Sequence, residues 1–178
     1  DEKQAKLFAL DDGEVIDLQS TEYHEVFTEI TDDDVILIDG GGNSLAWVTA
    51  ASPHTANIIT FDGVQSTKAI DVNATANAAQ DEQVLALTGT EVDYTNATIT
   101  GIVLDESHMV VEVNLSAITR LVLVDLETGG QRILGDPLFP VAAPSIGHGL
   151  VAWQHQQFLD SLDPSPASLD WDVAYHVI

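Results

Sequence analysis

Short apolar runs recur along the chain between clusters of Gly, Asp, Asn, Ser and Pro. Residues 35–38, 57–61, 109–113 and 121–124 are examples, and each is rich in Val, Ile or Leu. Apolar runs bounded by turn-forming residues are typical of β-strands. No stretch keeps a helical period for more than about two turns. The pattern therefore predicts an all-β protein.

One segment is a candidate helix. Residues 74–87 contain several alanines, which favour a helix, together with Asn and Asp residues, which lower the helix propensity.

An internal repeat is the most informative feature of the sequence. Residues 35–47, 101–112 and 144–153 share one pattern, a strand, a turn and a second strand. Each is followed by a loop and a third strand, and the first two continue into a fourth. Residues 6–18 read as a further copy of the last two strands. Because one sheet cannot bury both of its faces alone, the repeat predicts four-stranded antiparallel sheets that stack face to face.

The repeat divides a single β-repeat domain, residues 1–178, into five segments. They are a partial N-terminal unit, a complete unit, an insertion, a second complete unit and an incomplete unit: residues 1–32, 33–72, 73–98, 99–136 and 137–178.

The last unit resembles the blades of TolB-like, WD40-like β-propellers of bacterial or archaeal type. Those blades read Pro-x-Ile-x-Gly-x-x-Val-x-Trp, then Asp-Ile-Tyr, then Asp-x-x-Thr-Gly. The matching residues here are Pro144, Ile146, Gly147, Val151, Trp153, Asp172, Val173 and Tyr175, with Asp125, Thr128 and Gly129 in the preceding unit. The resemblance is good over about residues 99–178 and weaker over 33–72.

The resemblance implies stacked propeller blades in an extracellular protein. About three and a half units are fewer than the four to eight blades of a closed propeller. We therefore expect part of a propeller or a ring completed by another chain, with a β-sandwich as the alternative.

The composition is strongly acidic. The 178 residues include five Lys and Arg and 29 Asp and Glu, which gives a formal net charge of −24 at pH 7. Hydrophobic residues make up 45% of the chain. The apolar fraction predicts a folded protein, and the charge disfavours nucleic acids and anionic membranes as partners. The absence of cysteine excludes disulfides, zinc–thiolate sites and a cysteine nucleophile. Residues 138–146, the longest uncharged apolar stretch, are too short to span a bilayer, so no membrane insertion is expected.

Aromatic residues and histidines supply the candidate binding residues. Trp47 and Trp153 occupy matching repeat positions, which favours packing between sheets over ligand stacking. Trp171 follows an acidic loop and is expected to be partly exposed. His148 and His155 flank one predicted hairpin and could approach each other. A binding site is therefore expected to use Trp171, Trp153 and His155.

Two acidic runs offer oxygen ligands for Ca²⁺, although neither has EF-hand spacing. The candidate ligands are Asp32, Asp33, Asp34, Asp160, Asp163 and Asp170. A solvated acidic surface is the alternative interpretation. Three glycosylation sequons begin at Asn73, Asn96 and Asn114 and are compatible with a secreted glycoprotein.

No nucleophile elbow, P-loop or dinucleotide-binding motif occurs in the sequence. We therefore expect a non-enzymatic extracellular module that binds another protein, a copy of itself or a saccharide, or that builds a cell-surface or filament assembly. The alternative is a hydrolase that uses carboxylates or a bound metal in a propeller funnel. The acidic surface has few cations to offset its self-repulsion, so we expect salt to stabilise the fold, as suits a halophilic or marine habitat.

Overall fold

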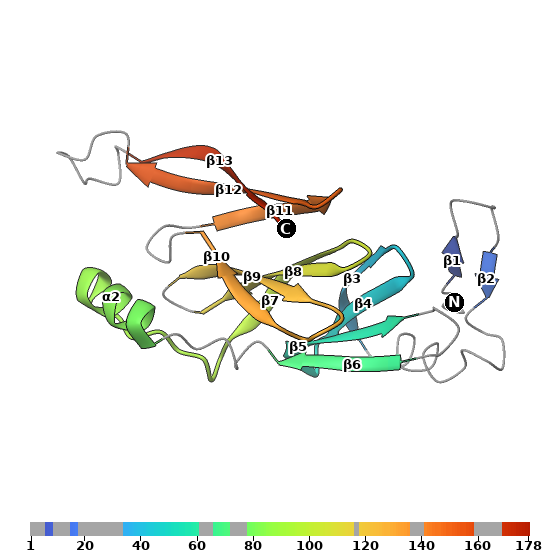
Figure 1. Ribbon diagram of the computed structural model, residues 1–178. Coiled ribbons are helices and arrows are strands. Elements are labelled where there is room, and N and C mark those ends of the chain that lie inside the picture. Colours follow the sequence, from blue (N-terminus) through green and yellow to red (C-terminus); the bar gives the residue numbers. More distant parts are fainter. Residues whose placement is uncertain are drawn as a thin grey trace.

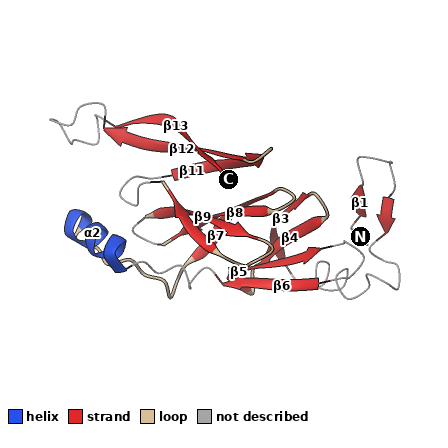
Figure 2. Cartoon of the chain, in the orientation of Figure 1, coloured by secondary structure: helices blue, strands red, loops and turns tan. Residues whose placement is uncertain are grey.

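The computed structural model describes residues 6–8, 15–17, 34–60, 66–71, 78–115, 118–135, 141–158 and 169–178. Almost all of its regular structure is strand, in three antiparallel sheets of three or four strands and one separate hairpin (Figures 1 and 2). The predicted all-β class is confirmed, and the described strands close into no barrel or ring.

The first sheet consists of β3 (Val35–Gly41), β4 (Ser44–Thr49), β5 (Ser52–Thr60) and β6 (Ser66–Asp71), in that spatial order. The second sheet consists of β7 (Thr98–Leu104), β8 (His108–Asn114), β9 (Thr119–Asp125) and β10 (Gln131–Leu134). Each strand pairs with the next one along the chain, so every connection within a sheet is a hairpin.

The third sheet has three described strands, β11 (Val141–Gly147), β12 (Leu150–Phe158) and β13 (Leu169–Val177). A short hairpin of β1 (Lys6–Phe8) and β2 (Val15–Asp17) lies near the N-terminus. The helix α2 (Ala78–Thr88) falls inside the segment expected to be an insertion and begins four residues after the predicted start.

The second sheet lies between the other two and is buried on both faces, as Figure 1 shows. One apolar cluster joins it to the first sheet, and its most buried members include Ala46, Val48, Ala56, Ile58, Met109, Val111 and Val122. A second cluster joins it to the third sheet and comprises Val110, Leu121, Leu123, Leu134, Val141, Val151 and Trp153. Alternation along each strand sends successive side chains to these two clusters, which is why the strands read as nearly continuous apolar runs.

The first strands of the three sheets lie next to one another. β7 contacts β3, β4 and β5 of the first sheet, and β11 contacts β7, β8 and β9 of the second. Each following sheet therefore places its first strand against the first three strands of the preceding one.

The glycines at the β3–β4 turn allow the first two sheets to approach closely. A Cβ atom on Gly41 would lie 2.5 Å from the carbonyl oxygen of Leu104, and Gly42 has a φ of 55°. Beside this contact, the backbone N–H of Leu104 donates a hydrogen bond to the Asp39 carboxylate at 2.7 Å. The predicted hairpin turn is thus also an inter-sheet contact.

The β9–β10 turn has the geometry that its sequence predicts. The Asp125 carboxylate accepts hydrogen bonds from the backbone N–H groups of Glu127 and Thr128, both at 2.9 Å. Gly129 then adopts a φ of 71°, a conformation that a residue with a Cβ adopts only with strain. The hydrogen bonds from these N–H groups lower the pKa of Asp125.

Candidate functional site

The outer face of the third sheet is the most distinctive surface of the described residues. Val173, Tyr175 and Val177 alternate along β13 and point away from the second sheet, with exposed fractions of 67%, 71% and 67%. Leu150, opposite Val177 on β12, is 41% exposed. The four side chains form an apolar face on an otherwise acidic protein, which we call the outer face.

Register equivalence shows how unusual this exposure is. In each sheet, the third residue of the second strand pairs with one residue of the third strand. That partner is Ile58 in the first sheet, Leu123 in the second and Tyr175 in the third. Ile58 is 2% exposed and Leu123 is 6% exposed, because the following sheet covers each of them, whereas Tyr175 is 71% exposed. The outer face thus carries apolar residues at positions that the other two sheets bury under a neighbour.

The described part of the outer face has few polar groups, and exposed Ser145, which is paired with Ala152, is one of them. Ala152 and Gln154 are paired with Tyr175 and Val173 and therefore share their face. The sequence analysis quoted Tyr175 only for its resemblance to a blade motif. The alternation of apolar and polar residues in residues 172–177 is the signal that marks one face of this strand.

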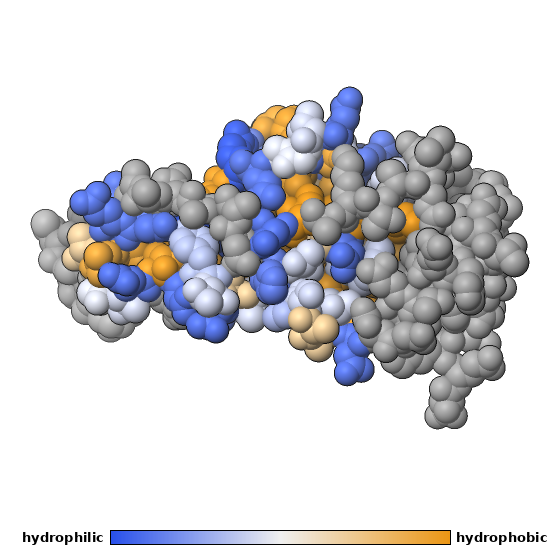
Figure 3. Space-filling model, turned by 90° about the horizontal axis from the view of Figure 1, so that it is seen from below, coloured by the Kyte–Doolittle hydropathy of each residue, from blue (hydrophilic) through white to orange (hydrophobic). Residues whose placement is uncertain are grey.

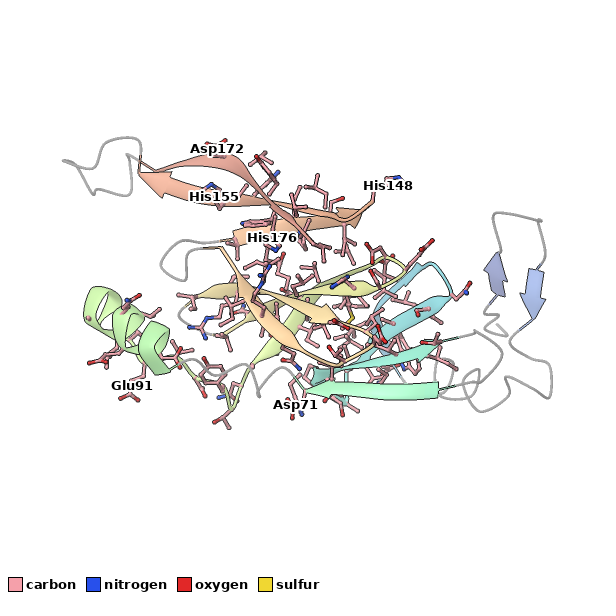
Figure 4. All side chains as sticks on the ribbon, viewed as in Figure 1. Asp71, Glu91, His148, His155, Asp172 and His176 are labelled. Atoms are coloured by element: carbon pink, nitrogen blue, oxygen red, sulfur yellow. The ribbon has the colours of Figure 1, made fainter. Side chains whose placement is uncertain are left out.

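A different set of polar residues lies on the inner side of the third sheet. His176 points toward the second sheet (Figure 4) and accepts a hydrogen bond from the guanidinium of Arg132 on β10. Asp172 lies opposite His155 across the β12–β13 pair. Glu112 of β8 accepts a hydrogen bond from the backbone N–H of Ala143 at 3.2 Å, next to the bulge in β11. The Arg132–His176 and Glu112–Ala143 hydrogen bonds fasten the third sheet to the second.

The predicted approach of His148 to His155 is wrong. His148 sits in the β11–β12 turn with a φ of 53°, and His155 lies well along β12, opposite Val141 (Figure 4). At about 3.3 Å per strand residue, the two rings are held far apart.

The two described tryptophan side chains are buried, as their repeat positions predict. Trp153 is 6% exposed and packs in the cluster between the second and third sheets, so its ring offers no surface for stacking a ligand. Trp47 is fully buried on the face of β4 that points away from the second sheet, so it does not pack between these two sheets. The side chain of Trp171 is outside the described residues.

The predicted calcium ligands lie largely outside the described residues, namely Asp32, Asp33, Asp160, Asp163 and the side chain of Asp170. Asp34 is exposed just before β3. Within the described ranges, no group of three or more His, Asp or Glu could hold a metal ion.

Two of the three predicted glycosylation sites are described and exposed. Asn96 donates a hydrogen bond from its amide to Asp93 at 2.7 Å, and this bond is the main reason why the pKa of Asp93 is lowered. Asn114 ends β8, and Asn73 lies outside the described residues.

No helix in the described part of the chain is long and apolar enough to cross a membrane.

Sequence reasoning missed a buried charge cluster between α2 and the second sheet. Arg120 of β9 is 1% exposed and forms an ion pair with Asp81 of α2 at 2.7 Å. The Tyr94 hydroxyl donates to both carboxylate oxygens of Asp81, at 2.9 and 3.0 Å, and accepts a hydrogen bond from Arg120. Burial is the largest cause of a raised pKa of Tyr94. Only the lone cation in the apolar run of residues 120–124 hinted at this cluster.

Seen from below, hydrophobic surface appears in separate areas among hydrophilic residues (Figure 3).

The chain matches no family model, and no curated protein and no solved structure is significantly similar to it.

Proposed function

We propose that this chain is a protein-binding β-repeat module of the propeller type, without catalytic activity, and that its outer face docks against a β-sheet of another protein. The observation that carries the proposal is the exposure of Tyr175 at a position that the first and second sheets bury under a neighbouring sheet.

The stacking of the sheets supports the propeller part of the proposal. Consecutive four-stranded sheets with their first strands side by side are the arrangement of neighbouring propeller blades. A further sheet could place its first strand against β11, β12 and β13 in the way that β11 lies against the second sheet.

The chemistry of the outer face favours a protein over a saccharide. Sugar hydroxyls need several precisely placed polar groups, whereas this face presents Leu150, Val173, Tyr175 and Val177 with few polar groups, the Gln154 amide and the Ser145 and Tyr175 hydroxyls. Contiguous exposed apolar residues on a soluble protein mark interaction sites. The face therefore suits a second apolar sheet.

An extracellular location, in a cell-surface or filament assembly, is part of the proposal. Asn96 and Asn114 are both exposed, as a glycosylated asparagine must be. Mass measurement of the native chain before and after deglycosylation tests this location; an unmodified chain argues against it.

Photo-crosslinking in cells that express the chain tests the binding function. A benzophenone amino acid replaces Tyr175, and the same group at exposed Glu91, on the loop after α2 (Figure 4), serves as the control. We expect a discrete protein adduct from position 175 that Leu150→Asp abolishes. No adduct from position 175, or equal adducts from position 91, would refute the proposal.

The alternative, a hydrolase dependent on carboxylates or a metal, stays a prediction from the sequence. Calcium as a stabilising ion stays one as well. A hydrolase screen tests the first, and melting with and without a chelator tests the second.

A further inference from the structure

The backbone of β11 contains a strained position. Within the described ranges, Ala143 and His148 are the non-glycine residues with a positive φ, of 50° and 53°. His148 lies in the two-residue turn before β12, where a positive φ is typical. Ala143 instead lies within the strand and precedes Pro144, although the residue before a proline favours an extended conformation. Ala143 is exposed, so close packing does not force it into this conformation.

A bulge in β11 is the origin of the strain. Ala143 and Pro144 together lie opposite Trp153, so β11 has one residue more than β12 over this stretch. Val141 and Ile146 are five positions apart, and a regular strand would send them to opposite faces. The bulge turns both toward the second sheet, where Val141 is 4% exposed and Ile146 packs against the same cluster. The bulge therefore keeps Val141 buried and leaves Ala143 strained, because such bulges usually have Gly at the left-handed position.

One side chain of the second sheet holds the bulge. One oxygen of the Glu112 carboxylate accepts the backbone N–H of Ala143 at 3.2 Å, and the other accepts the Thr100 hydroxyl at 2.9 Å. β3 and β7 also have register shifts, at Ile36 and Thr100, but neither of these residues has a positive φ. In β11, the strain and the contact with Glu112 coincide at Ala143.

We propose that β11 has two registers and that the Glu112 hydrogen bond selects the bulged one. In the second register, which we call the slipped register, Ala143 is extended and Pro144 alone lies opposite Trp153. Val141 then leaves the cluster for the opposite face of the sheet, and Ala142 takes its place on the inner face. This inference goes beyond the proposed function and needs no partner.

The slipped register accommodates the proline. A two-residue turn joins β11 to β12, so Gly147 and Leu150 form a hydrogen-bonded pair. Hydrogen-bonded and non-hydrogen-bonded pairs alternate from there, which makes Pro144 and Trp153 a non-hydrogen-bonded pair. The missing N–H of Pro144 then removes no bond of the ladder, and Ala143 adopts the extended conformation that a following proline favours.

The effects that separate the two registers are similar in size. A left-handed conformation at Ala143 disfavours the bulged register by a factor of about 5 to 100. Burying Val141 in place of Ala142 adds two carbons to the cluster and favours the bulged register by a factor of about 15. The hydrogen bond to the charged Glu112 favours it by a further factor of about 10 to 100. The bulged register therefore predominates with this bond, and the two registers become comparable without it.

A slip would also change the outer face. Position 141 would lie opposite Gln156, on the same side of the sheet as Gln154, so Val141 would add an apolar side chain there. A partner that docks on the outer face would then favour the slipped register. This consequence rests on the proposed function, whereas the existence of the two registers does not.

Thiol labelling of the purified full chain tests the two registers, and the chain has no cysteine of its own. Val141→Cys and Ala142→Cys are prepared separately, each with Glu112 and with Glu112→Ala. We expect Glu112→Ala to raise the labelling rate at position 141 about tenfold and to lower the rate at position 142, because a slip exchanges the faces of neighbouring residues.

Two control variants distinguish a slip from general loosening. Val151, on β12, belongs to the same cluster and is 0% exposed, so the labelling rate of Val151→Cys should change little with Glu112→Ala. Ala143→Gly removes the strain from the bulge. Added to Glu112→Ala, it should return the rates at positions 141 and 142 close to those measured with Glu112.

Three results would overturn the inference. The first is an unchanged labelling rate at position 141 in Glu112→Ala. The second is a parallel rise at positions 141 and 142, which indicates fraying of the strand. The third is a rise at position 151, which indicates detachment of the third sheet. None of them bears on the proposed function, which photo-crosslinking from position 175 tests independently.

Discussion

The ion pair between Asp81 and Arg120 makes a quantitative test of what holds α2 to the second sheet. Arg120 is 1% exposed, and Asp81, at 22% exposed, is its carboxylate partner at 2.7 Å. Asp81→Ala removes the carboxylate and leaves the guanidinium buried without its counter-charge. Tyr94 loses its acceptor at the same time.

Breaking a buried pair by removing one partner costs about 3–5 kcal/mol of unfolding free energy. Because Asp81 still reaches solvent, we expect the lower end of that range, about 3 kcal/mol. Replacing Arg120 with Met, which fills a similar volume and has no charge, is expected to cost much less, since well-packed apolar residues substitute for buried pairs with little loss. In the Arg120→Met background, Asp81→Ala should cost under about 1 kcal/mol.

Urea unfolding of the four proteins of this cycle measures these differences. With a slope of about 2–3 kcal/mol per molar urea, a loss of 3 kcal/mol lowers the midpoint by about 1–1.5 M. The reasoning is refuted if Asp81→Ala alone shifts the midpoint by less than about 0.3 M, or if it shifts the midpoint equally in the Arg120→Met background.

Three further predictions follow from the packing, the pKa of Tyr94 and the charge. Gly41→Ala should cost about 2–3 kcal/mol in urea unfolding, because its Cβ would meet Leu104, whereas Gly147→Ala, with open space around it, should change little; equal costs contradict the close contact. Burial raises the pKa of Tyr94, so the unfolded state loses the phenolic proton first and stability should fall as the pH rises above about 10. Tyr94→Phe should flatten that part of the pH profile, and an unchanged slope argues against the assignment. The melting temperature should rise from low to molar NaCl because salt screens a net charge of −24; a flat or falling trend removes the charge argument.

The strands and hairpins of this fold could be predicted because their signals are local. Turn residues such as Asp125 and Gly129 fix a hairpin within a few positions. Matching repeat positions also indicated that Trp47 and Trp153 are buried. Alternation and repetition are properties of one strand or one unit, so a single sequence displays them.

Features that depend on residues far apart in the chain could not be predicted. Nothing in residues 119–125 points to Asp81, which lies 39 residues before Arg120 and reaches it only because α2 packs at the end of the second sheet. The side to which the Trp47 side chain points depends on which of the two apolar faces of β4 packs against the second sheet. Likewise, Tyr175 has the same register position as its buried counterpart Leu123, and whether another sheet covers that position depends on residues elsewhere in the chain.

The middle position of the second sheet governs how the molecule opens. Each sheet is a run of consecutive hairpins, so its internal contacts form without help from distant segments, while coupling between sheets passes only through neighbouring faces. The third sheet can detach by giving up one apolar cluster, whereas the second must give up two. Amide hydrogens of β8 and β9 should therefore exchange last, at the rate of global unfolding, and those of β12 earlier, through partial opening. The third sheet shares the smaller of the two clusters, so it is expected to open more readily than the second sheet, and a partner that covers it would slow exchange there first.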